Sequence, residues 1–155
     1  MQLFTPVGEA REQAAHALRR VVTAISAGDS VLAADILDGV PPESPDEHAA
    51  TVSGCIGVGL GLVDYWLSGH DHKVPARLGE QVRLPAGHWV GERAATAVLA
   101  LSRKGRAFRS LNTLIARQGG QHVLYGSALA VGATVQRWSD LTGTSVPHLA
   151  QAHIR

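Results

Sequence analysis

Three histidines near the middle of the chain have a spacing that could bind a metal ion. His70 and His72 flank Asp71, and His88 follows in the same stretch. An extended His-x-His segment points both imidazoles to one side, and a catalytic zinc ion needs three protein ligands and one open position. The pattern therefore permits a metal-dependent enzyme built on His70, His72 and His88. The alternative is that these histidines lie exposed in a loop, since the other histidines are scattered, and that the protein needs no cofactor.

The basic residues of the chain are concentrated in its C-terminal half. Residues 1–92 hold 12 acidic and 6 basic residues, a net charge of −6, whereas residues 93–155 hold 1 acidic and 8 basic residues, a net charge of +7. No carboxylate occurs from residue 93 to residue 139. Basic side chains of this density can contact phosphates or an acidic protein surface. The candidate anion-binding residues of this half are Arg103, Lys104, Arg106, Arg109 and Arg117.

This charge distribution predicts a non-enzymatic binding protein whose basic half contacts an anionic partner, with nucleic acid as the leading candidate. Phe108 is the only aromatic residue within residues 93–118, so stacking on single-stranded bases has little support. The alternative is a solvated face that pairs with the acidic half, either within one chain or between copies in a homo-oligomer. The sequence contains no Ser-His-acid or Cys-His arrangement that would indicate a nucleophilic enzyme.

The last residues of the chain, "WSDLTGTSVPHLAQAHIR" (138–155), resemble the helix-turn-helix of small bacterial transcription regulators. In that family a Leu-Thr-Gly-x-Ser turn joins two helices, and an apolar residue follows inside the second helix. The matching residues are Leu141, Thr142, Gly143, Ser145 and Leu149. The resemblance implies that residues 146–153 read DNA. Its candidate base contacts are Val146, His148, Gln151 and His153. The alternative is an ordinary corner between two helices.

Trp89, Val90 and Gly91, followed by "ERAATA", resemble the Trp-x-Gly element of small helical proteins exported by actinobacterial secretion systems. In those proteins the element forms the tight turn of a helical hairpin. The resemblance implies a self-assembling or secretion-associated interaction protein, in which the charge asymmetry drives association. The alternative is that Trp89 packs over the start of a helix.

The elements that must position these residues are predicted to be helices. Aromatic residues are few, which disfavours strands, and 155 residues suit one domain. We therefore expect an all-α protein, a single-domain bundle of about six helices covering residues 1–155, with a long irregular loop at 69–87 and a strand pair within residues 76–84. The expected helices lie between Thr5 and Gly28, from Asp29 or Ser30 to Leu37, at 45–68, from Trp89 with an interruption at Gly105, at 121–141, and after a cap at Thr144 or Ser145.

The segment "SGCIGVGLG" (53–61) falls inside the expected helix 45–68, which has its own start signal in "SPDE" (44–47). A phosphate-binding glycine loop would instead join a strand to a helix. We therefore interpret the glycines as a stripe of small residues in a central, buried helix. The expected packing residues are Gly54, Gly57 and Gly61 on this helix, facing Gly126, Ala130 and Ala133 on the helix 121–141.

Cysteine content and hydropathy suggest a soluble cytoplasmic protein without a membrane partner. Cys55 is the only cysteine, so no internal disulfide can form. The N-terminal residues lack the basic and then apolar order of a signal peptide. The apolar centre of the longest charge-free stretch, residues 123–135, is shorter than the roughly 20 residues needed to span a bilayer.

Overall fold

The computed structural model describes residues 8–38, 59, 61, 63–67, 74–84, 91–106 and 110–155. These residues form helices and their connections, without any strand among them, so the all-α expectation is confirmed. The delimited helices are α1 (Gly8–Ser26), α2 (Ser30–Asp38), α4 (Leu78–Gln81), α5 (Glu92–Ser102), α6 (Leu111–Gln118), α7 (Gly120–Thr142) and α8 (Val146–His153). Residues 63–67 are also helical. There are more helices than the six or so expected, because α4 was not foreseen and α5 and α6 are separate.

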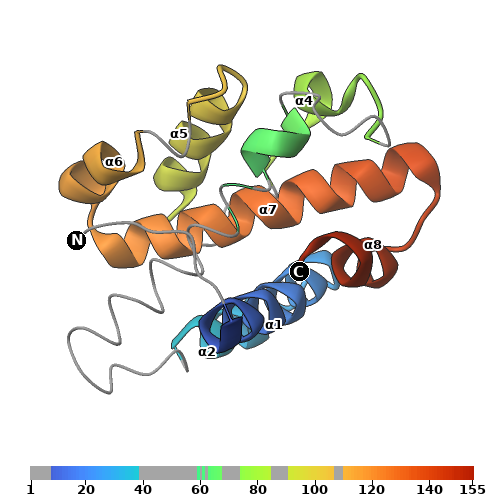
Figure 1. Cartoon of the computed structure of the whole chain (residues 1–155), viewed down its shortest axis with the longest axis horizontal. Coiled ribbons are helices and arrows are strands. Elements are labelled where there is room, and N and C mark those ends of the chain that lie inside the picture. Colours follow the sequence, from blue (N-terminus) through green and yellow to red (C-terminus); the bar gives the residue numbers. More distant parts are fainter. Residues whose placement is uncertain are drawn as a thin grey trace.

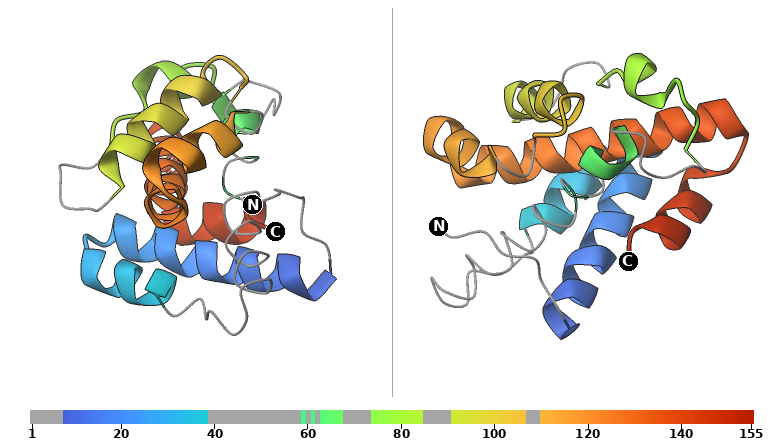
Figure 2. Two further views of the ribbon diagram at one scale, coloured as in Figure 1. Left: turned by 90° about the vertical axis from the view of Figure 1, so that its left-hand side faces the viewer. Right: turned by 45° about the horizontal axis from the view of Figure 1, so that its top comes forward.

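Helix α7 is the central element of the described structure. It contacts every other delimited helix, with α4, α5 and α6 on one side and α1, α2 and α8 on the other (Figures 1 and 2). Residues 123–135 of α7 are all buried, as expected for a helix that is apolar all round and lies between two layers. The central position had been expected for the helix 45–68, most of which lies outside the described residues. None of the described helices combines the length and the hydropathy needed to cross a membrane.

Several helix boundaries follow from local capping residues that the sequence indicated. The Asp29 carboxylate accepts a hydrogen bond of 2.9 Å from the Leu32 backbone N–H at the start of α2. The Ser145 hydroxyl accepts a longer bond of 3.4 Å from the His148 N–H at the start of α8. Gly105 lies in the break between α5 and α6 with a φ of +65°, a conformation that favours glycine. The expected cap at Thr5 lies outside the described residues.

The segment 74–84 is helical at its centre and does not form the expected strand pair. Val74, Leu78 and Val82 are spaced four residues apart and are all buried, which is the periodicity of a helix face. Leu78 is the first residue of the short helix α4 and Val82 is its C-cap, and α4 packs on α7. The expected strand pair is therefore wrong, because the four-residue spacing of these buried apolar side chains favours a helix.

Helices α5 and α7 approach each other very closely at Gly126. A Cβ built at Gly126 would lie 2.5 Å from the Ala94 Cβ and 2.7 Å from the Ala95 backbone nitrogen. Gly126 therefore packs against α5. Gly91, just before α5, is equally tight, since its Cβ would lie 2.8 Å from the Gly126 nitrogen.

Two glycines of the segment 53–61, Gly59 and Gly61, lie within the described residues. A Cβ at Gly61 would meet no atom of the described residues within 4 Å, whereas one at Gly59 would lie 3.1 Å from Val131 Cγ2. Val63 and Trp66 are buried and share a helical face with Gly59. Gly59 therefore contacts α7, while Gly54 and Gly57 lie outside the described residues and the packing expected for the stripe stays a prediction. Ala130 and Ala133 are buried as expected.

Candidate anion-binding surface

Helices α5 and α6, from the first part of the basic half, form a layer on one side of α7, whereas α8 of the same half lies on the other side. Within the described residues, α5 and α6 contact α7 and each other, and neither contacts α1 or α2 (Figure 1). Four exposed side chains of this layer, which we call the basic surface, are Arg93, Lys104, Arg106 and Arg117. Glu92 is the one carboxylate in the described residues from α5 through α6. Arg109 lies outside the described residues.

The opposite layer carries most of the described acidic side chains. Its exposed carboxylates are Glu9, Glu12, Asp29, Asp35 and Asp38. Because α7 separates α1 and α2 from α5 and α6 (Figure 2), these carboxylates do not cover the basic surface within one described chain. Helix α1 also carries Arg11, Arg19 and Arg20, so this layer has only a small excess of acidic side chains.

Arg103 and Arg137 have structural roles in the described residues. The Arg103 Nε and Nη2 groups donate to the carbonyls of Gly79 and Val82, at 3.0 and 3.1 Å. The Arg137 Nη2 group donates to the side-chain oxygen of Gln81. Both arginines thereby hold the α4 segment against α5 and α7. Arg103 is exposed but partly engaged, so it is a poorer candidate for phosphate contact than Lys104 or Arg106.

The C-terminal helix has the turn that the sequence indicated but only part of the expected reading face. Helix α7 ends at Thr142 and α8 begins at Val146. Val146 is 4% exposed, and the His153 ring lies 4.4 Å from the Trp138 ring. Both side chains pack inward because residues 146, 149, 150 and 153 share one face of α8. The expectation that Val146 contacts bases is therefore wrong, whereas His153 is half-buried and stays a candidate.

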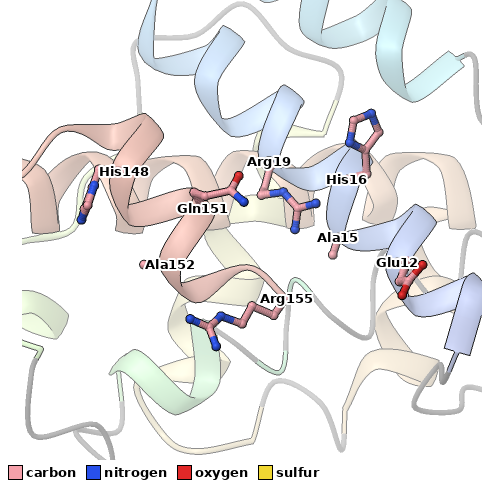
Figure 3. A pocket seen from close by; sticks show the side chains of 8 residues that line it. All are labelled: Glu12, Ala15, His16, Arg19, His148, Gln151, Ala152 and Arg155. Atoms are coloured by element: carbon pink, nitrogen blue, oxygen red, sulfur yellow. The ribbon is translucent and has the colours of Figure 1, made fainter.

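His148 and Gln151 are exposed and border a groove between α1 and α8 (Figure 3). The groove has a volume of about 820 Å³. Arg19 is fixed at its side, since its Nη1 group donates to the Ile154 carbonyl at 2.6 Å. A helix reads bases by entering the major groove, and here α1 lies beside the face of α8 that carries His148 and Gln151. Any duplex that these two residues contact must therefore also accommodate α1.

The predicted metal ligands His70, His72 and His88 lie outside the described residues. Across the described ranges, no three His, Cys, Asp or Glu side chains are grouped closely enough to hold a metal ion. Of the Trp-x-Gly element, only Gly91 is described, at the start of α5 with a φ of +112°.

One polar contact between the layers was not foreseen from the sequence. The Tyr125 hydroxyl on α7 donates to the Asp38 carboxylate at the end of α2. Burial of the phenol, and then its bond to Asp38, raise the pKa of Tyr125. The two residues are far apart in the chain, and the only signal for Tyr125 was its place in a long apolar stretch.

Comparison of the chain with protein-family models, curated proteins and solved structures finds no match. Its function must therefore be inferred from its own side chains and their arrangement.

Proposed function

We propose that the protein is a non-enzymatic binding protein that holds nucleic acid through the phosphates. The observation that supports this most directly is the basic surface, which is exposed on a layer that α1 and α2 do not contact. A surface that faces only water usually mixes both signs of charge. Here a single carboxylate, that of Glu92, accompanies the four cationic side chains in the described residues from α5 through α6.

The same surface favours contact with the sugar-phosphate backbone over recognition of bases. Lys104 and Arg106 lie in the turn between α5 and α6, and Arg117 lies in the last turn of α6. No aromatic side chain is exposed among the described residues of this layer, so bases have no platform on which to stack. Phosphate contacts carry no sequence information, and the proposed binding is therefore largely independent of sequence. His148 and Gln151 remain candidate base contacts at a separate site on α8.

Titration of labelled duplexes of several sequences with charge-neutralising variants tests this proposal. Lys104→Gln and Arg106→Gln should weaken binding to a similar extent on every duplex. Arg20→Gln is the matched control, because Arg20 is also exposed but lies on α1 in the opposite layer. A loss of affinity in the control as large as in the two variants would contradict the proposed location of the surface.

A second candidate function is head-to-tail self-association. Helix α2 exposes Val31 by 72% and Leu32 by 44%, next to the exposed carboxylates of Asp29 and Asp35. An acidic and apolar patch on one layer is complementary to a basic surface on the other. Such a contact joins different faces of two copies, so it produces rings or open chains. Sedimentation should then show species that grow with concentration and disappear in a Val31→Ser, Leu32→Ser variant, whereas a monomer at all concentrations would exclude this function.

A further inference from the structure

A cavity of about 550 Å³ opens where α5 begins, α6 ends and α7 begins. Pockets of this size are typical of small-molecule sites. Basic side chains from three helices meet in its lining. The lining residues are Gly91, Glu92, Arg93, Ala94, Arg117, Gln118 and His122.

The packing of α5 against α7 fixes this cavity. A Cβ at Gly91 would lie 2.9 Å from both the His122 carbonyl oxygen and the Tyr125 Cβ. The start of α5 is thus pressed against the first turn of α7. This contact brings Arg93, two residues further along α5, to the same cavity as His122.

His122 presents one ring nitrogen for a ligand. Its Nδ1 lies 2.8 Å from the Gln118 carbonyl oxygen in the last turn of α6. A carbonyl oxygen can only accept, so Nδ1 carries the proton of this hydrogen bond. The Nε2 atom is then the ring nitrogen that can meet a ligand, and in the protonated imidazole it donates.

The backbone at the start of α5 adds weaker support for an anion. The N-cap residue, Gly91, has no side chain that accepts from the first turn, and the first N–H groups of a helix lack partners within it. The guanidinium groups of Arg93 and Arg117 can each form paired hydrogen bonds to phosphate oxygens. The carboxylate of Glu92 opposes an anion at the same place.

We propose that this cavity binds the dianionic phosphate of a monoester or of free phosphate, held by Arg93, Arg117 and His122. A terminal phosphate carries more charge than a backbone diester and can enter a concave site, whereas a diester is flanked by chain on both sides. If the cavity binds the phosphorylated end of a nucleic acid, the inference rests on the proposed function. If the cavity binds free phosphate, the inference is independent of that function.

Two titrations of the full chain distinguish these sources of phosphate. One titrates inorganic phosphate and follows the changes in the NMR chemical shifts of the Gly91, Arg93 and His122 backbone amides. The other compares single-stranded oligonucleotides of one sequence with a 5′-phosphate or a 5′-hydroxyl. The phosphorylated form should bind about tenfold more tightly, as one charge-assisted hydrogen bond implies. The Arg93→Gln, Arg117→Gln variant should lose both the phosphate shifts and this preference, since both arginines are exposed and their replacement leaves the core intact.

Two controls separate the cavity from the rest of the basic surface. Glu92→Gln should increase affinity for inorganic phosphate, because it removes the opposing charge. Lys104→Gln should weaken duplex binding and leave the 5′-phosphate preference unchanged. Saturable phosphate binding without a 5′ preference would support free phosphate as the ligand.

The remaining outcomes distinguish this inference from the proposed function. If inorganic phosphate causes no saturable shifts and the 5′-phosphate gives no preference, while duplexes still bind, the cavity proposal is overturned and the nucleic-acid function stands. If phosphate binds and duplexes do not, the cavity proposal stands and the nucleic-acid function is overturned.

Discussion

The crossing of α5 over α7 gives the most quantitative prediction about the fold, through the substitution Gly126→Ala. The added Cβ would lie 2.5 Å from the Ala94 Cβ, 2.7 Å from the Ala95 nitrogen and 2.9 Å from the Ala94 carbonyl carbon. Side-chain Cβ atoms do not approach other atoms this closely in folded proteins. Two of the three atoms belong to the backbone, so no side-chain rotation can relieve the contact and α5 has to move.

The expected loss of stability follows from two opposing terms. Overpacking of a core typically costs about 1–3 kcal/mol, and a contact with backbone should fall in the upper part of this range. Replacing glycine by alanine inside a helix returns about 1 kcal/mol. Gly126→Ala should therefore lower the free energy of unfolding by roughly 1–2 kcal/mol, and the melting temperature by about 2–4 °C for each kcal/mol.

Two further glycine-to-alanine variants serve as controls in chemical and thermal denaturation. At Gly132 the three atoms nearest to the new Cβ belong to the Ile25 side chain, at 3.1–3.5 Å. This side chain can shift, so the change should be close to neutral. At Gly61 no described atom lies within 4 Å, and the gain in helix propensity should stabilise the protein. If Gly126→Ala is as stable as the wild type, or more stable, the close crossing of α5 and α7 is refuted.

Three other measurements test separate parts of the structure. Tyr125→Phe should cost about 1 kcal/mol through loss of the bond to Asp38. Because the pKa of Tyr125 is raised in the folded state, the neutral phenol stabilises the fold below the ordinary tyrosine pKa of about 10, and this contribution is lost as the pH rises further. Above that pH, the free energy of unfolding should thus decrease faster for the wild type than for the variant. Parallel plots of this free energy against pH would refute the link between Tyr125 ionisation and stability. Asp29→Ala should cost about 1 kcal/mol through loss of the α2 cap, whereas Asp35→Ala, mid-helix and exposed, should change stability little; equal effects would contradict the cap. Elemental analysis of untagged protein tests the hypothesis that His70, His72 and His88 bind zinc. The hypothesis predicts that the wild type contains bound metal and that a His70→Ala, His72→Ala variant does not. A wild type without metal, after zinc has been added and the excess removed, would exclude the zinc site.

The parts of the fold that could be predicted from the sequence depend on local interactions. Asp29 and Ser145 cap their helices through bonds to residues three positions away, and Gly105 marks the break between α5 and α6. Such signals act within one turn and need no knowledge of the tertiary structure. The partner of Gly126 could not be predicted in this way, because any helix with a small side chain at the crossing would satisfy the same pattern.

The candidate site was predictable in composition but not in geometry. The absence of carboxylates from residue 93 to residue 139 indicated a basic surface. That Arg103 would instead bond to the Gly79 and Val82 carbonyls depends on where the α4 segment lies relative to the end of α5. The cavity between Arg93, Arg117 and His122 was missed for a similar reason. Arg93 and Arg117 are distant in sequence and meet only because α5, α6 and α7 pack together.

The salt dependence of duplex binding tests the central claim most directly. Each phosphate contact releases condensed counterions, so the slope of log K against log salt concentration should fall by about 0.9 for each contact removed. The basic surface predicts this decrease for both Lys104→Gln and Arg106→Gln, and an unchanged slope for Arg20→Gln on the opposite layer. No duplex binding by the wild type at about 50 mM salt, where such contacts are strong, would contradict the claim. So would a slope that is the same in all four proteins.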